Sequence, residues 1–233
     1  CEAFSGVPVL LMTASLPQAK LKALTEVTAR LGGYLAEIQG ALDLEAIPRY
    51  RLERVTTETV WGSVEQVLAS GGKVLWVTNT VDRAVSFGKE AVKRGLKPVL
   101  PYHSRYRYCD RVEKHRAVIE AFKKRGPTLA VTTQVCEISL NISADLLVTD
   151  LAPIASLIQR LGRLNRYVTV ETPNQPRAAL FLTPDTPLPY EESEIARAHT
   201  WLDRLGAGPV SQTGLAQTFV QVLGEGGEPQ FVA

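Results

Sequence analysis

Short apolar runs alternate with amphipathic stretches along most of the chain, and the amphipathic stretches commonly stop at a glycine such as Gly71, Gly95 or Gly126. This alternation is typical of βαβ units and predicts an α/β fold with a parallel sheet. The predicted strands are residues 7–12, 49–57 (more exposed than the others), 73–78, 97–102, 128–133, 144–150 and 177–183. The predicted helices are residues 17–31, 60–70, 81–94, 108–125, 153–166, 190–205 and 211–223, before a glycine-rich tail that we expect to be disordered.

Composition narrows the class of protein. With 233 residues, 45% of them hydrophobic, the chain is long enough for one large core or two smaller ones. The net charge is only +2, so any nucleic-acid partner must be met by a local patch. No apolar run is long enough to span a membrane, and we expect no membrane partner.

The cysteines indicate a reduced compartment. Cys1, Cys109 and Cys136 are odd in number and lack the spacing of a metal site. We therefore expect a cytoplasmic protein with no metal ligands of its own. The first residue is Cys1 rather than Met, which is typical of a fragment or a processed product.

The segment PIASLIQRLGRLNR, residues 153–166, concentrates positive charge. On a helical wheel Gln159, Arg163 and Arg166 fall within roughly 60° of one another, with Arg160 on the flank. A glycine inside a helix costs about 1 kcal/mol relative to alanine, so Gly162 indicates that a ligand or backbone approaches closely. Guanidinium groups suit phosphate oxygens, although a solvated cationic face is the simpler alternative.

Polar residues follow nearly every predicted strand. In open parallel sheets, ligands bind beyond the carboxyl ends of the strands, so this edge of the sheet is the predicted site. Any single one of these side chains is explained equally well as a turn cap or a solvent-facing group. The residues concerned are Thr13 and Ser15 in TASLP, Asn79 and Thr80 in NTVDR, His103, Ser104 and Arg105 in HSRYR, and Thr133, Gln134, Glu137 and Asn141 from TQVCEISLN.

TTQVCEISLNISADLLVTDLAPIASLIQRLGRLNR resembles the fifth and sixth motifs of superfamily-two helicases, in particular the CRISPR-associated helicase–nuclease of type I systems. LLMTASLP resembles the third motif of that family, and VLWVTNTVDRAVSF and YHSRY resemble the fourth-motif region. The resemblance covers almost the whole chain. It implies the second RecA-like lobe of the motor, a three-layer parallel sheet with helices on both faces and a small helical extension.

The resemblance also implies roles. Arg163 and Arg166 would be arginine fingers that reach the γ-phosphate of ATP bound with Mg²⁺, and Gln159 would hold that phosphate or the attacking water. Further nucleotide contacts would come from Asn141, Glu137, Gly162 and Arg160. Single-stranded DNA would be contacted by Thr133, Gln134, Asn79, Thr80, His103, Ser104 and Arg105. Thr13 and Ser15 would couple nucleotide state to the grip on DNA.

Two features depart from a complete motor. Asn141 stands where the family usually has aspartate, which removes a charge near the nucleotide. The phosphate-cradling G-x-x-x-x-G-K-[ST] loop and the acidic Mg²⁺ motif are both missing from the sequence. We expect both in a first lobe upstream of Cys1, so this chain alone should bind no ATP and should not hydrolyse it.

The expected organisation follows from the resemblance. Residues 1–50 would be the last strand and helix of the first lobe, 51–188 the second lobe and 189–233 the helical extension. The strand at 7–12 should pair with another polypeptide segment, since an unpaired central strand favours aggregation. Expected partners are single-stranded DNA, the missing first lobe, an HD nuclease domain and a CRISPR surveillance complex. The alternatives are another superfamily-two DNA or RNA helicase, or a non-catalytic nucleic-acid-binding module with the same fold.

Overall fold

The computed structural model describes residues 18–38, 40–171 and 175–225. The chain divides into two compact units, residues 1–38 and residues 39–233. The predicted strand at 7–12, its pairing, Thr13, Ser15 and most of the glycine-rich tail lie outside the described residues.

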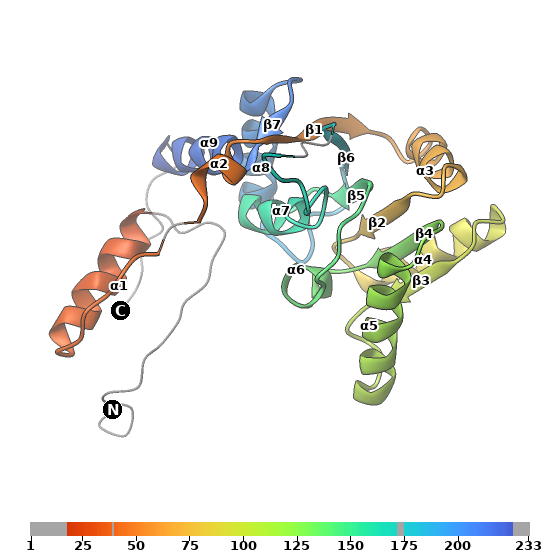
Figure 1. The fold of residues 1–233 in the computed structure, drawn as a ribbon, viewed down its shortest axis with the longest axis horizontal. Helices are drawn as coiled ribbons and strands as arrows, with labels where there is room; N and C mark the ends of the chain where they lie inside the picture. The colour runs from red at the N-terminus through yellow and green to blue at the C-terminus, as the bar shows by residue number, and fades with distance from the viewer. Residues whose placement is uncertain (1–17, 39, 172–174, 226–233) are drawn as a thin grey trace. The chain divides into compact units, whose positions relative to one another are not determined.

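In the larger unit the described residues form a seven-stranded sheet in the order β3-β4-β2-β5-β6-β1-β7 (Figure 1). Neighbouring strands are parallel, except that β7 runs antiparallel to β1. The strands are β1 (Pro48–Val55), β2 (Lys73–Val77), β3 (Val99–Tyr102), β4 (Thr128–Thr132), β5 (Leu146–Asp150), β6 (Arg177–Leu182) and β7 (Val210–Ser211). The helices are α2 (Leu42–Glu45), α3 (Val60–Ala69), α4 (Val81–Lys93), α5 (Tyr108–Lys123), α6 (Val135–Ser139), α7 (Ile154–Leu161), α8 (Glu192–Leu205) and α9 (Gln212–Glu225).

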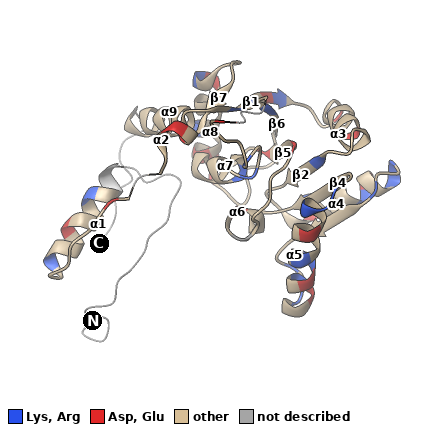
Figure 2. Ribbon diagram, in the orientation of Figure 1, with Lys and Arg blue, Asp and Glu red and all other residues tan. Residues whose placement is uncertain are grey.

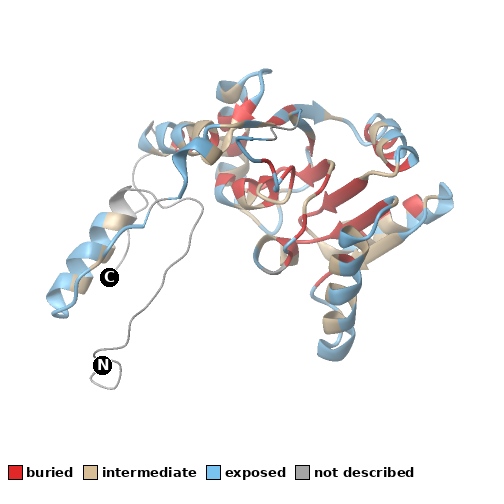
Figure 3. Ribbon diagram, in the orientation of Figure 1, coloured by how far each residue is buried: buried red, intermediate tan, exposed pale blue. Residues whose placement is uncertain are grey.

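Helices cover both faces of this sheet because the inner strands are apolar on both sides. Every residue of β2, β4 and β5 is buried (Figure 3). Alternate residues of β2 point to opposite faces, so Trp76 joins a core with α3 and α4, whereas Leu75 joins a second core with α5, α7, α8 and α9. Trp61 and Phe87 pack around Trp76 with ring centroids 4.7 and 4.5 Å away. The predicted three-layer α/β fold is confirmed.

In the smaller unit, α1 (Gln18–Arg30) ends one residue earlier than the predicted helix. Gly32 follows it with φ of +75°, the left-handed conformation that commonly closes a helix. Val27, Leu31, Tyr34 and Ile38 are exposed in this unit. The larger compact unit begins at residue 39. The predicted boundary between two motor lobes at residue 50 stays a prediction.

The predicted helix over 153–166 was too long. It ends at Leu161, and Gly162 is its C-cap rather than an interior residue. The chain then turns to pair Leu164 with Ala144, and Asn165 adopts a φ of +50°. The helical wheel therefore does not apply to Arg163 and Arg166, and the cost of an interior glycine does not arise.

Candidate functional site

The loops that follow β2, β4 and β5 meet at the carboxyl edge of the sheet through Asn79. Its backbone N–H donates to Asp150 Oδ2 at 3.0 Å, and its side-chain Nδ2 donates to the carbonyl of Leu151 at 2.6 Å. Gln134 Nε2 donates to the Asn79 carbonyl at 2.7 Å. Asn79 is 3% exposed. Its polar groups thus join three loops of the predicted site.

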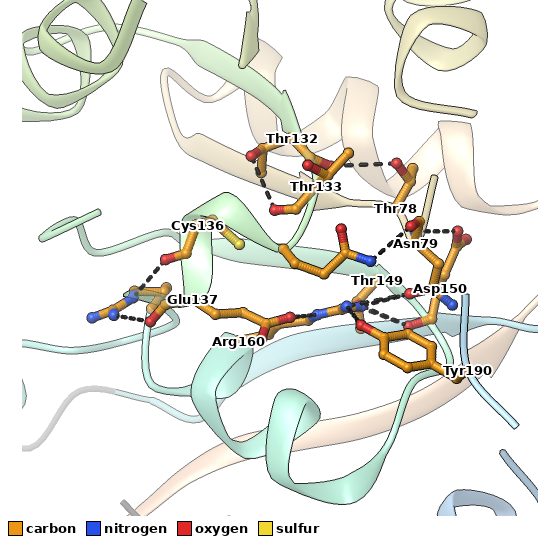
Figure 4. A network of polar contacts seen from close by, with 12 residues as sticks. Thr78, Asn79, Thr132, Thr133, Cys136, Glu137, Thr149, Asp150, Arg160 and Tyr190 are labelled. Atoms are coloured by element: carbon orange, nitrogen blue, oxygen red, sulfur yellow. Dashed lines mark hydrogen bonds and ion pairs between the residues drawn. The ribbon is translucent and has the colours of Figure 1, made fainter. Parts of the chain in front are cut away.

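Arg160 occupies the centre of this edge (Figure 4). Its Nε donates to Glu137 Oε1 at 2.9 Å, and both terminal nitrogens donate to Asn79 Oδ1 at 3.2 Å. Nη1 also donates to Thr149 Oγ1 at 2.9 Å, and Nη2 donates to the Tyr190 hydroxyl at 3.3 Å. The residue is 0% exposed, so the side chain that the helical wheel places on the flank of the helix is buried among these loops. In this arrangement Arg160 joins the loops, and its contact with a nucleotide stays a prediction.

Arg163 lies beside α6 and is held by backbone carbonyls of that helix. Its Nε donates to the carbonyl of Cys136 at 3.2 Å, and its Nη2 donates to the carbonyl of Glu137 at 2.5 Å. Burial, and next the charge of Arg166, lower the pKa of the Arg163 guanidinium. An arginine still remains protonated in a protein, so two like charges lie near each other here.

Arg166 is exposed, and its Nη1 donates to the carbonyl of Gly162 at 3.0 Å. Within the described part of the chain, neither Arg163 nor Arg166 forms an ion pair with a carboxylate. A pair of cations that forms no ion pair with a carboxylate favours an anionic ligand.

Gly162 also has a local role. A Cβ there would lie 3.3 Å from the carbonyl of Gln159, tighter than usual contacts. The backbone of Arg163 meanwhile accepts a hydrogen bond from the N–H of Ala144 at 2.8 Å. A side chain at residue 162 would therefore crowd the last turn of α7, next to the point where the chain turns toward Ala144.

Sequence reasoning missed the pair of Arg83 and Asp150. Asp150 is wholly buried, and Arg83 reaches it through two bonds, Nε to Oδ2 at 2.9 Å and Nη2 to Oδ1 at 2.8 Å. These hydrogen bonds raise the pKa of Arg83 above its ordinary value. The available signal was Asp150, a charged residue at the end of the strand LLVTD, which the sequence predicts to be buried.

The predicted DNA contacts differ in accessibility. Thr133 is 2% exposed and His103 is 7% exposed, whereas Ser104 and Arg105 are exposed. Thr80 accepts a hydrogen bond from the backbone N–H of Arg83 at 3.4 Å and caps α4. Arg105 pairs with Asp82 at 2.6 Å on the surface.

The remaining predicted nucleotide contacts are Asn141, which is exposed, and Gln159, which is partly exposed. Over residues 18–38, 40–171 and 175–225, no group of three or more His, Cys, Asp or Glu side chains gathers as metal ligands would. A shallow depression of about 240 Å³ lies apart from this edge, between β1, β6 and α8. No helix in the same ranges is long and apolar enough to cross a membrane.

Part of the chain matches a known protein family. The family described as CRISPR-associated nuclease/helicase Cas3, C-terminal, matches residues 70–169, which contain β2 to β5 and all of α7. The chain is therefore similar to the C-terminal helicase region of Cas3.

Individual Cas3 proteins extend the match. A putative CRISPR-associated nuclease/helicase Cas3 of Myxococcus xanthus is 49% identical over 94% of this chain and 29% of its own length. One of Methanocaldococcus jannaschii is 42% identical over 39% of this chain and 13% of its own length. The chain therefore spans less than a third of these relatives.

Solved structures show the same fold. A crystal structure of T. fusca Cas3 with AMPPNP superposes with a TM-score of 0.66 at 24% identity, over 80% of this chain and 24% of the other. The crystal structure of a CRISPR-associated protein gives a TM-score of 0.73 at 22% identity, over 97% of this chain and 30% of the other. A chain in a CRISPR RNA-guided surveillance complex, in a pre-nicking state, gives 0.61 at 25% identity, over 76% of this chain and 25% of that chain.

Proposed function

We propose that this chain is the second motor lobe of an ATP-dependent DNA helicase in CRISPR defence, with Arg163 and Arg166 as its arginine fingers. One observation carries the proposal. Two neighbouring guanidinium groups lie next to each other beyond the end of α7, and within the described residues neither forms an ion pair with a carboxylate. A phosphate oxygen is the anion that such a pair suits best.

The carbonyls of Cys136 and Glu137 fix where the guanidinium of Arg163 lies. Glu137 is itself fixed through the bond from Arg160 to its carboxylate. ATP with Mg²⁺, shared with the first lobe, would supply the phosphoryl group that is transferred to water. Arg163 and Arg166 would then stabilise the negative charge that develops in the transition state, a contribution of about 10³ to 10⁵ in rate.

The DNA contacts divide into two groups. Thr80, Ser104 and Arg105 are at least partly exposed, so we assign them direct contact with the phosphates of single-stranded DNA. Asn79 and Thr133 are buried, so they act by holding the loops after β2 and β4 in place. Gln134 ties those two loops together through its bond to the Asn79 carbonyl.

Movement along DNA requires the first lobe, since the phosphate-cradling loop is absent from this sequence. Closure of the two lobes on ATP would bring Arg163 and Arg166 against the nucleotide. Thr13 and Ser15 would pass this change to the DNA contacts. Because relatives are named nuclease/helicase and one similar chain is part of a surveillance complex, we include a nuclease domain and such a complex among the partners.

The test is to supply the first lobe, fused or as a separate chain, and to measure ATP hydrolysis with and without single-stranded DNA. The account predicts hydrolysis that DNA stimulates and that neither lobe shows alone. Stimulation only by RNA would identify an RNA helicase instead. DNA binding without hydrolysis in either format would identify a non-catalytic binding module, consistent with Asn141 in place of the usual aspartate.

A further inference from the structure

Tyrosines and basic residues alternate where β3 leads into α5. The sequence YHSRYRYCDRVEKHR, residues 102–116, carries five Arg or Lys against two acids, so its net charge of +3 exceeds the +2 of the whole chain. We define the tyrosine–arginine surface as Tyr106, Arg107, Tyr108, Arg111 and Lys114. Charged residues of both signs are visible along α5 in Figure 2.

The cations of this surface lack acidic partners. Within the described ranges, Arg107, Arg111 and Lys114 form no ion pair with a carboxylate, although Asp110 and Glu113 lie on the same helix. Arg111 instead lies over the ring of Tyr108, 5.7 Å from its centroid, and Lys114 lies 6.0 Å from the centroid of Tyr106. Such contacts at exposed sites are weak, so these charges remain available to an anionic partner.

The aromatic rings are accessible or stacked rather than buried in a core. Tyr108 is 76% exposed, so its ring is accessible to a ligand. The ring of Tyr106 stacks on His103, with centroids 4.3 Å apart and planes 10° apart. His103 Nδ1 is buried and has no hydrogen-bond partner among the described residues. The surface therefore offers an exposed aromatic ring and cations together, next to a buried histidine that supports the Tyr106 ring.

The position of the surface extends the proposed DNA path. β3 is an edge strand, and its carboxyl end lies on the same edge of the sheet as those of β4 and β2. The pair between Arg105 and Asp82 joins this loop to the first turn of α4. A strand of DNA that passes Thr80 can continue over the start of α5.

We propose that the tyrosine–arginine surface binds single-stranded DNA by base stacking on Tyr108 and phosphate contact with Arg107 and Arg111, whether or not nucleotide is bound. This proposal rests on the proposed function, because it extends the same DNA path. Base stacking on aromatic rings tolerates any sequence, which suits a motor that moves along DNA. An acidic protein segment would use the cations but would have no need of an exposed ring.

The experiment measures binding of the 233-residue chain to a fluorescein-labelled oligothymidine of about 20 nucleotides by anisotropy, without ATP. We expect Tyr108→Ala to weaken binding about 5- to 100-fold and Tyr108→Phe to retain it, because the ring rather than the hydroxyl stacks. Tyr34→Ala is the matched control, since Tyr34 is 90% exposed in the smaller unit. Arg107→Ala and Arg111→Ala should each reduce the slope of log affinity against log salt by about 0.7.

Several results would overturn the proposal. One is unchanged affinity in Tyr108→Ala. Another is an equal loss of affinity in Tyr34→Ala. A third is competition by polyglutamate that depends on Arg107 and Arg111 but not on Tyr108, which would identify an acidic protein partner. Thermal unfolding of each variant excludes misfolding as the cause. If DNA-stimulated ATPase of the two-lobe protein persists while Tyr108→Ala binds normally, this proposal fails and the proposed function stands.

Discussion

Arg160 donates its Nε to the carboxylate of Glu137 across 2.9 Å, and the arginine is completely buried. The backbone carbonyl of the same Glu137 accepts a hydrogen bond from Arg163. One residue of α6 thus orders two arginines of the QRLGR segment, the first through its side chain and the second through its main chain. Arg160 joins the loops of the site from inside, whereas Arg163 is partly exposed.

Replacing Arg160 should destabilise the protein strongly. Arg160→Met removes the only cation that pairs with Glu137 in the described structure and leaves Asn79 Oδ1 without its donor. Breaking a buried pair from one side costs about 3–5 kcal/mol, which urea unfolding of the chain would measure. Arg54→Ala is the control, because its partner Asp203 is exposed and such surface pairs contribute about 0–1 kcal/mol. Equal losses in the two variants would contradict the structural role of Arg160.

Arg83 forms ion pairs with two aspartates, the buried Asp150 and the exposed Asp185, so the effects of burial on stability can be compared. Asp150→Asn removes the charge from a wholly buried partner, whereas Asp185→Asn removes it from one whose side chain is 98% exposed and 3.7 Å away. We expect the first to lower the free energy of unfolding by about 3 kcal/mol and the second to change it by less than about 1 kcal/mol. Chemical denaturation of both variants measures this, and a similar effect for both would count against the structure at this edge.

His103 should make the protein less stable in acid. Burial, and next the charge of Arg105, lower the pKa of His103 below its ordinary value of 6.5. The folded protein therefore takes up a proton less readily than the unfolded chain, so stability is intact above about pH 7 and falls as the pH drops through 6.5. His103→Gln cannot titrate and should lose less stability than the natural chain between about pH 7.5 and 5.5.

Two measurements check this. Thermal unfolding across that pH range should show that the difference in Tm between the natural chain and His103→Gln narrows or reverses in acid. NMR titration of the His103 ring should give a midpoint below 6.5. A midpoint at or above 6.5, or a difference in Tm that does not vary with pH, would show that the ring is not held in its neutral form.

The apolar pattern was sufficient to predict most of the sheet. Continuous apolar runs such as KVLWVT and TLAVTT are typical of strands covered on both faces, and β2 and β4 match them to within one residue. The two-residue β7 and the short α2 and α6 carry no periodic signal of that length. The order of the strands, with β1 and β7 beyond β6, depends on long-range pairing that no local pattern contains.

The polar site was predicted less completely. The residues after the strands do gather at one edge, as Asn79, Gln134 and Glu137 show. The directions of the arginines were missed, because a continuous helix was assumed through Gly162. Once the helix ends at Leu161, Arg163 turns onto α6 while Arg160 stays inside, and that turn is held by long-range contacts such as the pairing of Leu164 with Ala144.

The most direct test of the central claim is DNA-stimulated ATP hydrolysis by the two-lobe protein carrying Arg163→Ala or Arg166→Ala, with Arg54→Ala as the control. The account predicts that kcat falls by about 10³-fold or more in each variant, while folding and DNA binding stay close to those of the natural protein. Full hydrolysis in both variants would contradict the assignment of these guanidinium groups to the phosphate of ATP.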